Sequence, residues 1–266
     1  MRRVQSSARA AGARGAENEG ISVAKPGLFV TATDTEVGKT VVAGGLVLAL
    51  RAHGFDVGVM KPAATGCRSR RGKTLAEDVE FLMEAAATDD ERELVCPYML
   101  RDPLAPQVAA EREDSRLDIR RIRSAFQKLR SRHDAMIVEG AGGVYVPLRP
   151  RYYMLDLMSD LGLPALVVIR PALGTINHTL LTLDALRARK IPVAGVIMNN
   201  YPKRPSLAER TNPEVLRDCP GVPFLGVLPR LEMVSVSQRR FDGLQNAIEE
   251  AIDVGQLVDF LRRNCR

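Results

Sequence analysis

Short apolar segments alternate along the chain with longer segments in which apolar residues recur at helical spacing. The short segments are rich in Val, Ile and Leu and predict buried strands at Leu28–Ala32, Val57–Met60, Ala135–Val138, Ala165–Ile169, Val193–Met198 and Phe224–Leu228. The longer segments predict helices at Val41–His53, Leu75–Ala87, Ile119–Arg132, Ile176–Arg189 and Leu207–Cys219. This alternation predicts an α/β fold with three layers, in which a mainly parallel sheet carries helices on both faces. Ligands of such folds bind at the carboxyl ends of the strands.

The two ends of the chain depart from this pattern. Residues 1–25 are rich in Arg, Ala and Gly and lack apolar periodicity, which predicts a disordered N-terminal extension or an overextended start. After Pro229 the pattern is helical again from about Gln238 to Arg263, with a break near Asp253–Gly255. We interpret this last segment as a covering element, so that residues 26–266 form one α/β domain.

Composition and charge narrow the choice of partners. Lys and Arg number 38 against 32 Asp and Glu, a formal net charge of +6. This excess is spread along the chain, and the densest basic stretch, Arg120–Arg132, has the spacing of a helix with one solvated face. With no Trp and 5% aromatic residues, nucleic-acid binding through base stacking has little support. We therefore expect no nucleic-acid partner.

The cysteines and the length of the apolar segments indicate the cellular compartment of the protein. The four cysteines, Cys67, Cys96, Cys219 and Cys265, show no close pairs and no metal-binding spacing with histidine, which is typical of reduced thiols. No apolar stretch reaches transmembrane length. We expect a cytoplasmic protein without a membrane partner.

The segment Thr33–Thr40, between the first predicted strand and helix, has the features of a phosphate-binding loop. The first turn of a helix has unpaired N–H groups and the positive end of the helix dipole, which together attract phosphate. Gly38 allows close approach of the backbone, Lys39 adds a mobile charge, and Thr40 offers a hydroxyl to a bound magnesium ion. The loop favours a fold of the P-loop nucleotide hydrolase type; the alternative is an ordinary strand, turn and helix with a solvated lysine.

This loop departs from the pattern G-x-x-x-x-G-K-[ST] in an informative way. Thr33 stands where the first glycine is expected, and the loop contains two acids, Asp34 and Glu36. Carboxylates facing the phosphates would repel them, so we expect at least one to face a cation or a hydrogen-bond donor. The two acids suggest a second, amine-bearing substrate beside the nucleotide.

Polar residues at other predicted strand ends are candidates for the same site. Lys61 follows the second strand, where its charge would neutralise a transferred phosphoryl group, although a plain surface lysine is an equal alternative. Glu139 closes the third strand and is placed as a magnesium-holding carboxylate, and the following Gly140–Gly143 would turn tightly around a ligand or form a simple turn. Asn199 and Asn200 end the fifth strand, where amides would pair with an adenine edge or form an ordinary turn.

A helix start supplies a different kind of candidate. Gly174, Thr175, Ile176 and Asn177 open the predicted helix after the fourth strand, with Thr175 as its expected N-cap. The free N–H groups of this first turn would receive a carboxylate.

Taken in order, these residues resemble the dethiobiotin synthetase family. The resemblance runs from about residue 27 to 232 and rests on the loop Thr33–Thr40, Lys61-Pro62 with Thr65-Gly66, Asp78, Glu139–Gly143, Gly174 with Ile176–His178, and Asn199. It implies an ATP- and magnesium-dependent ligase that closes the ureido ring of dethiobiotin from 7,8-diaminononanoate and carbon dioxide, in biotin biosynthesis. The implied route passes through a carbamate and its mixed anhydride with phosphate.

The resemblance also implies roles for individual residues. Lys39 and Lys61 would stabilise the carbamate and the transferring phosphoryl group; Thr40, Asp78 and Glu139 would hold magnesium. The diamine would lie near Thr35, Glu36 and Thr65, and its carboxylate would bind at Gly174–Asn177 across a homodimer interface. The nucleotide would contact the backbone from Glu36 through Val37 to Val41, with Gly140, Ala141 and Gly142 nearby and with Asn199, Asn200, Pro229, Arg230 and Leu231 bordering adenine.

Two other functions share parts of this pattern. An ATP-driven switch of the chromosome-partitioning type has the same sheet and Gly-Lys-Thr turn, but such proteins carry a lysine near the loop start, where this chain has Thr33 and Asp34. A glutamine-dependent synthetase of the cobyrinate type normally adds a glutaminase domain. The loop therefore favours the ring-closing ligase.

Overall fold

The fold is built on a six-stranded sheet. The computed structural model describes residues 25–70, 73–219 and 221–263, so the predicted extension lies outside the described residues except for Lys25. The sheet runs in the order β10-β9-β8-β1-β5-β2 and every neighbouring pair is parallel. Its strands are β1 (Gly27–Ala32), β2 (Val57–Met60), β5 (Ala135–Glu139), β8 (Ala165–Ile169), β9 (Val193–Tyr201) and β10 (Phe224–Pro229). All six predicted strands are confirmed.

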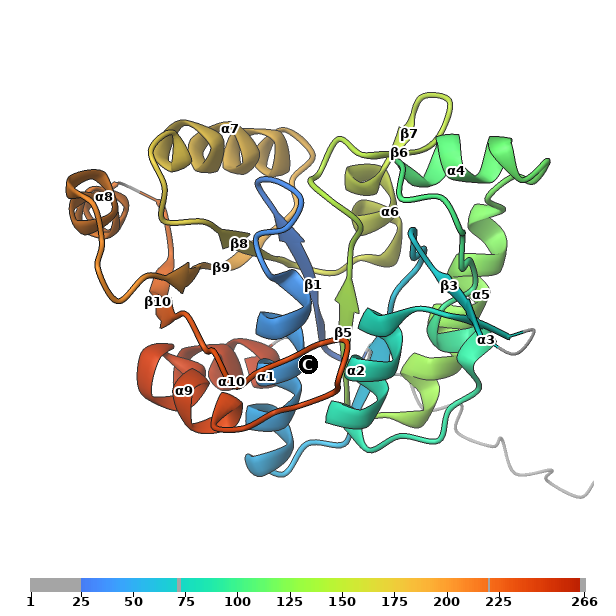
Figure 1. Ribbon diagram of the computed structural model, residues 1–266, viewed down its shortest axis with the longest axis horizontal. Coiled ribbons are helices and arrows are strands. Elements are labelled where there is room, and N and C mark those ends of the chain that lie inside the picture. The colour runs from blue at the N-terminus through green and yellow to red at the C-terminus, as the bar shows by residue number, and fades with distance from the viewer. Residues whose placement is uncertain (1–24, 71–72, 220, 264–266) are drawn as a thin grey trace, which may run out of the picture.

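Helices cover both faces of this sheet, as predicted (Figure 1). One face carries α1 (Lys39–Ala52), α2 (Glu77–Ala86), α9 (Leu244–Ala251) and α10 (Val254–Arg263). The other face carries α5 (Ile119–Arg132), α6 (Met154–Leu161) and α7 (Thr175–Ala188), and α8 (Leu207–Asp218) packs beside α7 and β10. Every residue of β1, β2, β5 and β8 is buried, because a parallel sheet covered on both faces needs apolar side chains on each side.

Smaller elements complete the fold around the sheet. They are the hairpins β3 (Arg68–Arg70) with β4 (Lys73–Leu75) and β6 (Pro147–Arg149) with β7 (Tyr152–Tyr153), and the short helices α3 (Arg92–Val95) and α4 (Pro106–Arg112). The sequence pattern predicted neither these elements nor α6. Short segments of this kind carry too few residues for a periodic signal. In the described part of the chain no helix has the length and apolar character needed to cross a membrane.

The C-terminal prediction was partly wrong. The helix expected from Gln238 begins at Leu244, because Arg239 (φ 53°) and Gly243 (φ 71°) have left-handed backbone that an α-helix does not allow. The preceding residues form a loop whose Phe241 ring stacks on Phe81, with centroids 4.4 Å apart. The break comes at 252–253, so Gly255 lies inside α10.

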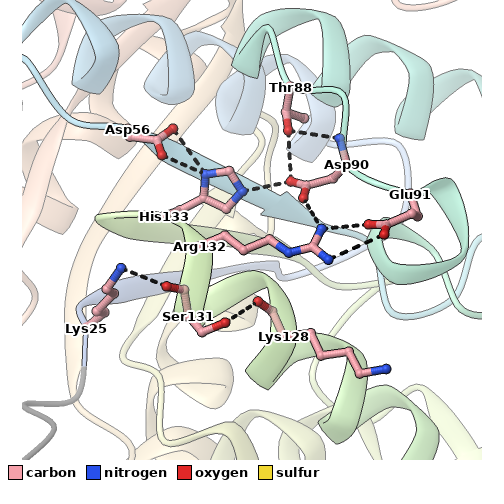
Figure 2. Close-up of polar contacts among 9 residues, drawn as sticks. All are labelled: Lys25, Asp56, Thr88, Asp90, Glu91, Lys128, Ser131, Arg132 and His133. Atoms are coloured by element: carbon pink, nitrogen blue, oxygen red, sulfur yellow. Dashed lines mark hydrogen bonds and ion pairs between the residues drawn. The ribbon is translucent and has the colours of Figure 1, made fainter.

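A polar cluster joins the starts of β2 and β5, at the end of the sheet away from the phosphate loop (Figure 2). His133 Nδ1 lies 3.0 Å from Asp56 Oδ1, and His133 Nε2 lies 2.7 Å from Asp90 Oδ2. The other Asp90 oxygen accepts from Arg132 Nη1 at 2.7 Å, and Thr88 Oγ1 donates to Asp90 at 2.8 Å. Burial by itself would raise the pKa of Asp90, but the Arg132, Thr88 and His133 contacts outweigh it and hold that pKa below its usual range. The cluster therefore favours the ionised carboxylate.

We expect His133→Ala to lower the free energy of unfolding by about 2–4 kcal/mol, because it leaves the buried Asp90 carboxylate without one partner and opens a gap beside β2. Urea denaturation followed by circular dichroism measures the change. The matched control is His53→Ala, since His53 is exposed at the end of α1. Equal stability of the two variants would contradict a structural role for the cluster.

Candidate active site

Many of the predicted site residues, though not those after β8 or at the ends of β9 and β10, surround one cavity of about 370 Å³ at the carboxyl ends of β1, β2 and β5. Its lining residues are Thr35, Glu36, Gly38, Lys39, Thr40, Lys61, Ala63, Thr65, Asp78, Glu139, Ala141 and Gly142. A larger cavity, about 950 Å³, lies between α4, α5 and β6, and two of its four arginines, Arg120 and Arg123, have Asp118 and Asp160 as acidic neighbours. The smaller cavity is the better candidate because buried charges converge in it.

The phosphate loop takes the backbone shape that its sequence predicts. Gly38 is the N-cap of α1 with φ 84°, and a Cβ added there would stand 2.2 Å from Asn199 Nδ2. Asn199 Nδ2 donates to the carbonyls of Val37 at 2.8 Å and of Gly38 at 3.4 Å. The amide thus holds the loop from β9, and the first N–H groups of α1 remain available for phosphate oxygens.

A buried cluster of opposite charges forms the wall facing the loop. Lys61 Nζ lies 2.6 Å from Glu139 Oε1 and 2.9 Å from Asp78 Oδ2, and Thr40 Oγ1 donates to the same Glu139 oxygen at 3.0 Å. Lys61 is 6% exposed and Glu139 1%. Burial alone would lower the pKa of Lys61, but Glu139 and Asp78 outweigh it and raise that pKa above its usual value. Lys61 is therefore a permanent cation in the site rather than a surface lysine.

Lys39 is the second lysine of the cavity and differs electrostatically from Lys61. Its Nζ donates to the main-chain carbonyl of Asp34 at 3.2 Å. Burial, assisted by the Lys61 ammonium and opposed by Glu139, lowers the pKa of Lys39 to about 8. An anionic ligand in the loop would favour its charged form.

The cavity also has oxygen ligands that suit a hard divalent cation. Glu139 Oε2 is buried and has no hydrogen-bond partner in the described part of the chain, whereas Oε1 has two. Thr40 and Asp78 supply the other oxygen atoms expected for magnesium. Among the described residues there is no group of three or more His, Cys, Asp or Glu side chains suited to hold a metal, so a cation here would depend on the Thr40 hydroxyl and on other ligands.

The two acids of the loop have different surroundings. Asp34 Oδ2 lies 3.3 Å from Arg170 Nη1, which confirms that one acid faces a cation. Arg170 follows β8 and was missed in the sequence analysis; a charged residue directly after a buried strand, as at Lys61, was the available signal. Glu36 is exposed, lines the cavity and has left-handed backbone (φ 56°), which is unusual for a residue other than glycine.

The start of α7 lies outside this cavity. The N-cap is Gly174 (φ 93°) and Thr175 is the first helical residue, so the N-cap prediction for Thr175 was wrong. A left-handed N-cap requires glycine more than it requires a capping side chain. The Thr175 hydroxyl is buried without a hydrogen-bond partner among the described residues, and Ile176 and Asn177 follow in the first turn.

The predicted adenine-side residues lie at the ends of β9 and β10. Asn199 and Asn200 are among the last residues of β9, which continues to Tyr201, one residue beyond Asn200. Pro229 ends β10, Arg230 N donates to Tyr201 O at 2.9 Å, and Leu231 packs against the core. None of these residues lines the cavity, although Asn199 contacts its loop.

Gly38→Ala tests whether the loop requires close approach at this position. We expect ATP affinity to fall on the order of 10-fold, because the added Cβ would displace Asn199 and with it the loop. The matched control is Gly54→Ala, where φ is +86° but no atom lies within 4 Å of the added Cβ. Calorimetric titration of both variants with ATP separates the clash from backbone strain, and equal affinities would contradict the role given to Asn199.

Comparisons with known proteins identify the fold. A family model described as an AAA domain matches residues 26–238. A plasmid partition protein of Borrelia burgdorferi bound to AMPPNP has a TM-score of 0.57 at 12% identity, covering 90% of this chain and 99% of that chain. MinD of Pyrococcus horikoshii, complexed with Mg-ADP, has a TM-score of 0.52 at 19% identity, covering 89% and 98%. At these identities the likeness shows the fold, which is the expected P-loop nucleotide hydrolase type.

Sequence relatives identify the family. The ATP-dependent dethiobiotin synthetase BioD of Thermodesulfovibrio yellowstonii is 42% identical over 236 residues, covering 86% of this chain and 98% of the relative. The enzyme of the same name from Anaeromyxobacter dehalogenans is 46% identical over 198 residues, covering 74% and 81%. The protein therefore belongs to the ATP-dependent dethiobiotin synthetase family.

Proposed function

We propose that this protein closes the ureido ring of dethiobiotin from 7,8-diaminononanoate and carbon dioxide, with ATP as co-substrate, in biotin biosynthesis. One amine adds to carbon dioxide and gives a carbamate. A carbamate oxygen then takes the γ-phosphoryl group of ATP and releases ADP. The second amine attacks the carbonyl carbon of the resulting carbamic–phosphoric anhydride, which forms the ring and releases phosphate.

The observation that carries this proposal is the pair of buried lysines in one cavity. Lys39 and Lys61 lie where negative charge would accumulate on the carbamate and on the transferring phosphoryl group. Thr35, Glu36 and Thr65 line the same cavity and would contact the diamine, with Glu36 facing its ammonium groups. Ala141 and Gly142 close the cavity beside them.

The nucleotide would follow the loop. Backbone N–H groups from Glu36 to Val41 would hold its phosphates, and Gly140–Gly142 would lie beside them. Asn199, Asn200 and Pro229–Leu231 would border adenine at the ends of β9 and β10. The contact between Asn199 and the loop supports this placement.

A magnesium ion would bind Thr40, Asp78 and Glu139. Glu139 Oε2 has no hydrogen-bond partner among the described residues, which supports this assignment, because a buried carboxylate oxygen without a donor is costly unless a cation reaches it. The ion would supply charge neutralisation at the phosphates. The ammonium of Lys61 contacts both carboxylates and offsets one of their two negative charges.

A homodimer would complete the site. Gly174–Asn177 lies outside the cavity, and we infer that it holds the diamine carboxylate in the site of a second copy. The helix dipole at this helix start suits such an anion. Leu173 and Leu181, 81% and 61% exposed, offer apolar surface for the contact.

We also infer a cytoplasmic location, which the free thiols of Cys67, Cys96 and Cys219 support.

A purified sample tests the activity directly. We expect phosphate release from ATP only when the diamine and bicarbonate are both present, because the phosphoryl acceptor is the carbamate that they form. A coupled phosphate assay with each substrate omitted in turn measures this dependence. Rapid ATP turnover stimulated by DNA or membranes without the diamine would instead indicate a partition-type switch.

Lys61→Ala tests the transition-state role of that lysine. We expect ATP binding to be retained and turnover to fall on the order of 100-fold or more, because the charge of Lys61 is needed mainly as the phosphoryl group transfers. Nucleotide titration and steady-state kinetics measure the two effects separately. Lys128→Ala, which removes an exposed lysine of α5, is the control and should leave both unchanged. Unchanged turnover in Lys61→Ala would remove Lys61 from the catalytic residues.

A further inference from the structure

Arg170 lies at the carboxyl edge of the sheet and has no role in the reaction described above. It follows β8 directly, and its Nη1 lies 3.3 Å from Asp34 Oδ2 in the phosphate loop. We propose that Arg170 is a positioning residue for this reaction, which fixes the start of the phosphate loop relative to the start of α7. The inference rests on the proposed synthetase function.

Asp34 connects this ion pair to the cavity through three different oxygens. Its Oδ2 faces Arg170, its Oδ1 accepts from the N–H of Thr35 at 2.8 Å, and its main-chain oxygen accepts from Lys39 Nζ at 3.2 Å. A shift of Asp34 would therefore move both a diamine-side hydroxyl and a catalytic lysine. Displacements of about 1 Å at such groups can cost up to about 100-fold in rate.

The other end of the ion pair leads into α7. The carbonyls of Pro171 and Ala172 accept from Asn212 Nδ2, at 2.7 Å and 3.3 Å, and Asn212 is 4% exposed inside α8. The N–H of Thr175 donates to the Ala172 carbonyl at 3.2 Å. The segment 170–174 is thus held from α8 on one side and from Asp34 on the other.

Arg170 has little else to hold it in the described part of the chain. Its Nε is buried and has no hydrogen-bond partner there, and Asp34 is the carboxylate within ion-pair distance. Because Asp34 is the acid that Arg170 contacts, a movement of Arg170 would also move the loop that contains Asp34. In the proposed homodimer, the ion pair would join a phosphate loop of one site to the helix start that serves the site of the second copy.

This arrangement predicts a selective kinetic effect. Both partners of the ion pair adjoin contacts proposed for the diamine, whereas ATP is held mainly by the backbone of residues 36–41. Loss of the ion pair should therefore raise the KM for the diamine more than the Kd for the nucleotide. A general loss of folding would weaken both.

The test compares Arg170→Ala, Arg170→Lys, Asp34→Asn and the double variant Arg170→Ala/Asp34→Asn. We expect Arg170→Ala to raise the KM for the diamine on the order of 10-fold while the Kd for ATP changes less than about 2-fold. Arg170→Lys should recover part of the loss, because it keeps a cation near Asp34. The double variant should be no worse than the more impaired single variant, because both remove one interaction.

Arg189→Ala is the matched control. Arg189 is also an arginine in an ion pair, with Asp156, and its side chain is 48% exposed against 42% for Arg170. It lies at the far end of α7, and its removal should leave the KM, kcat and Kd unchanged.

Three results would overturn the proposal: full activity with an unchanged KM in Arg170→Ala, losses that multiply in the double variant, or a nucleotide affinity that falls as much as the diamine KM rises. The wild-type enzyme is assayed first. If the wild-type enzyme shows no diamine-dependent phosphate release, both the synthetase function and this inference are wrong. If the wild-type enzyme is active and Arg170→Ala has the same kinetic constants, only the inference is wrong.

Discussion

The buried ion pair between Lys61 and Glu139 is the interaction on which the site depends. Each charge offsets the cost of burying the other, because an isolated ion in a protein interior costs several kcal/mol. Each is placed at the end of an apolar strand, β2 or β5, and the pairing of these strands brings the two together. Thr40 and Asp78 then join from α1 and α2, so one electrostatic requirement organises four elements around the cavity.

The phosphate loop is subject to the same requirement that buried charges have partners of opposite sign. Its helix start is positive, burial lowers the pKa of Lys39 to about 8, and the loop carries two acids of its own. Arg170 neutralises Asp34, which leaves Glu36 as the exposed carboxylate facing the cavity. Glu36 also has a backbone conformation that glycine would adopt at lower cost, roughly 1 kcal/mol or more. The proposed contact with the amine-bearing substrate would account for a carboxylate at this strained position.

The sequence predicted the sheet and the cavity well because both depend on local patterns. Buried parallel strands appear as apolar runs, and the charged residues that follow them, Lys61 and Glu139, must meet at one edge. Features that depend on distant partners were missed or wrongly placed. Arg170 belongs to no known sequence motif. Asn199 contacts a loop about 160 positions away in the chain. The N-cap of α7 is Gly174 rather than Thr175, and the left-handed φ of that glycine is visible only in the structure. The C-terminal loop was taken for helix because the packing of Phe241 on Phe81 leaves no periodic signal.

The polar cluster around His133 has a consequence for how inherited or engineered variants should be interpreted. Strands β2 and β5 are joined at one end by Asp56, His133 and Asp90, and at the other by Lys61 and Glu139. A four-residue strand spans only about 13 Å, so the His133 cluster and the Lys61–Glu139 ion pair lie close in space. The His133 cluster nevertheless lies outside the proposed active site. A slip of one residue between these strands would separate Lys61 from Glu139. Substitutions at Asp56 or Asp90 would therefore resemble active-site lesions in a growth phenotype, while every residue that touches substrate remained intact.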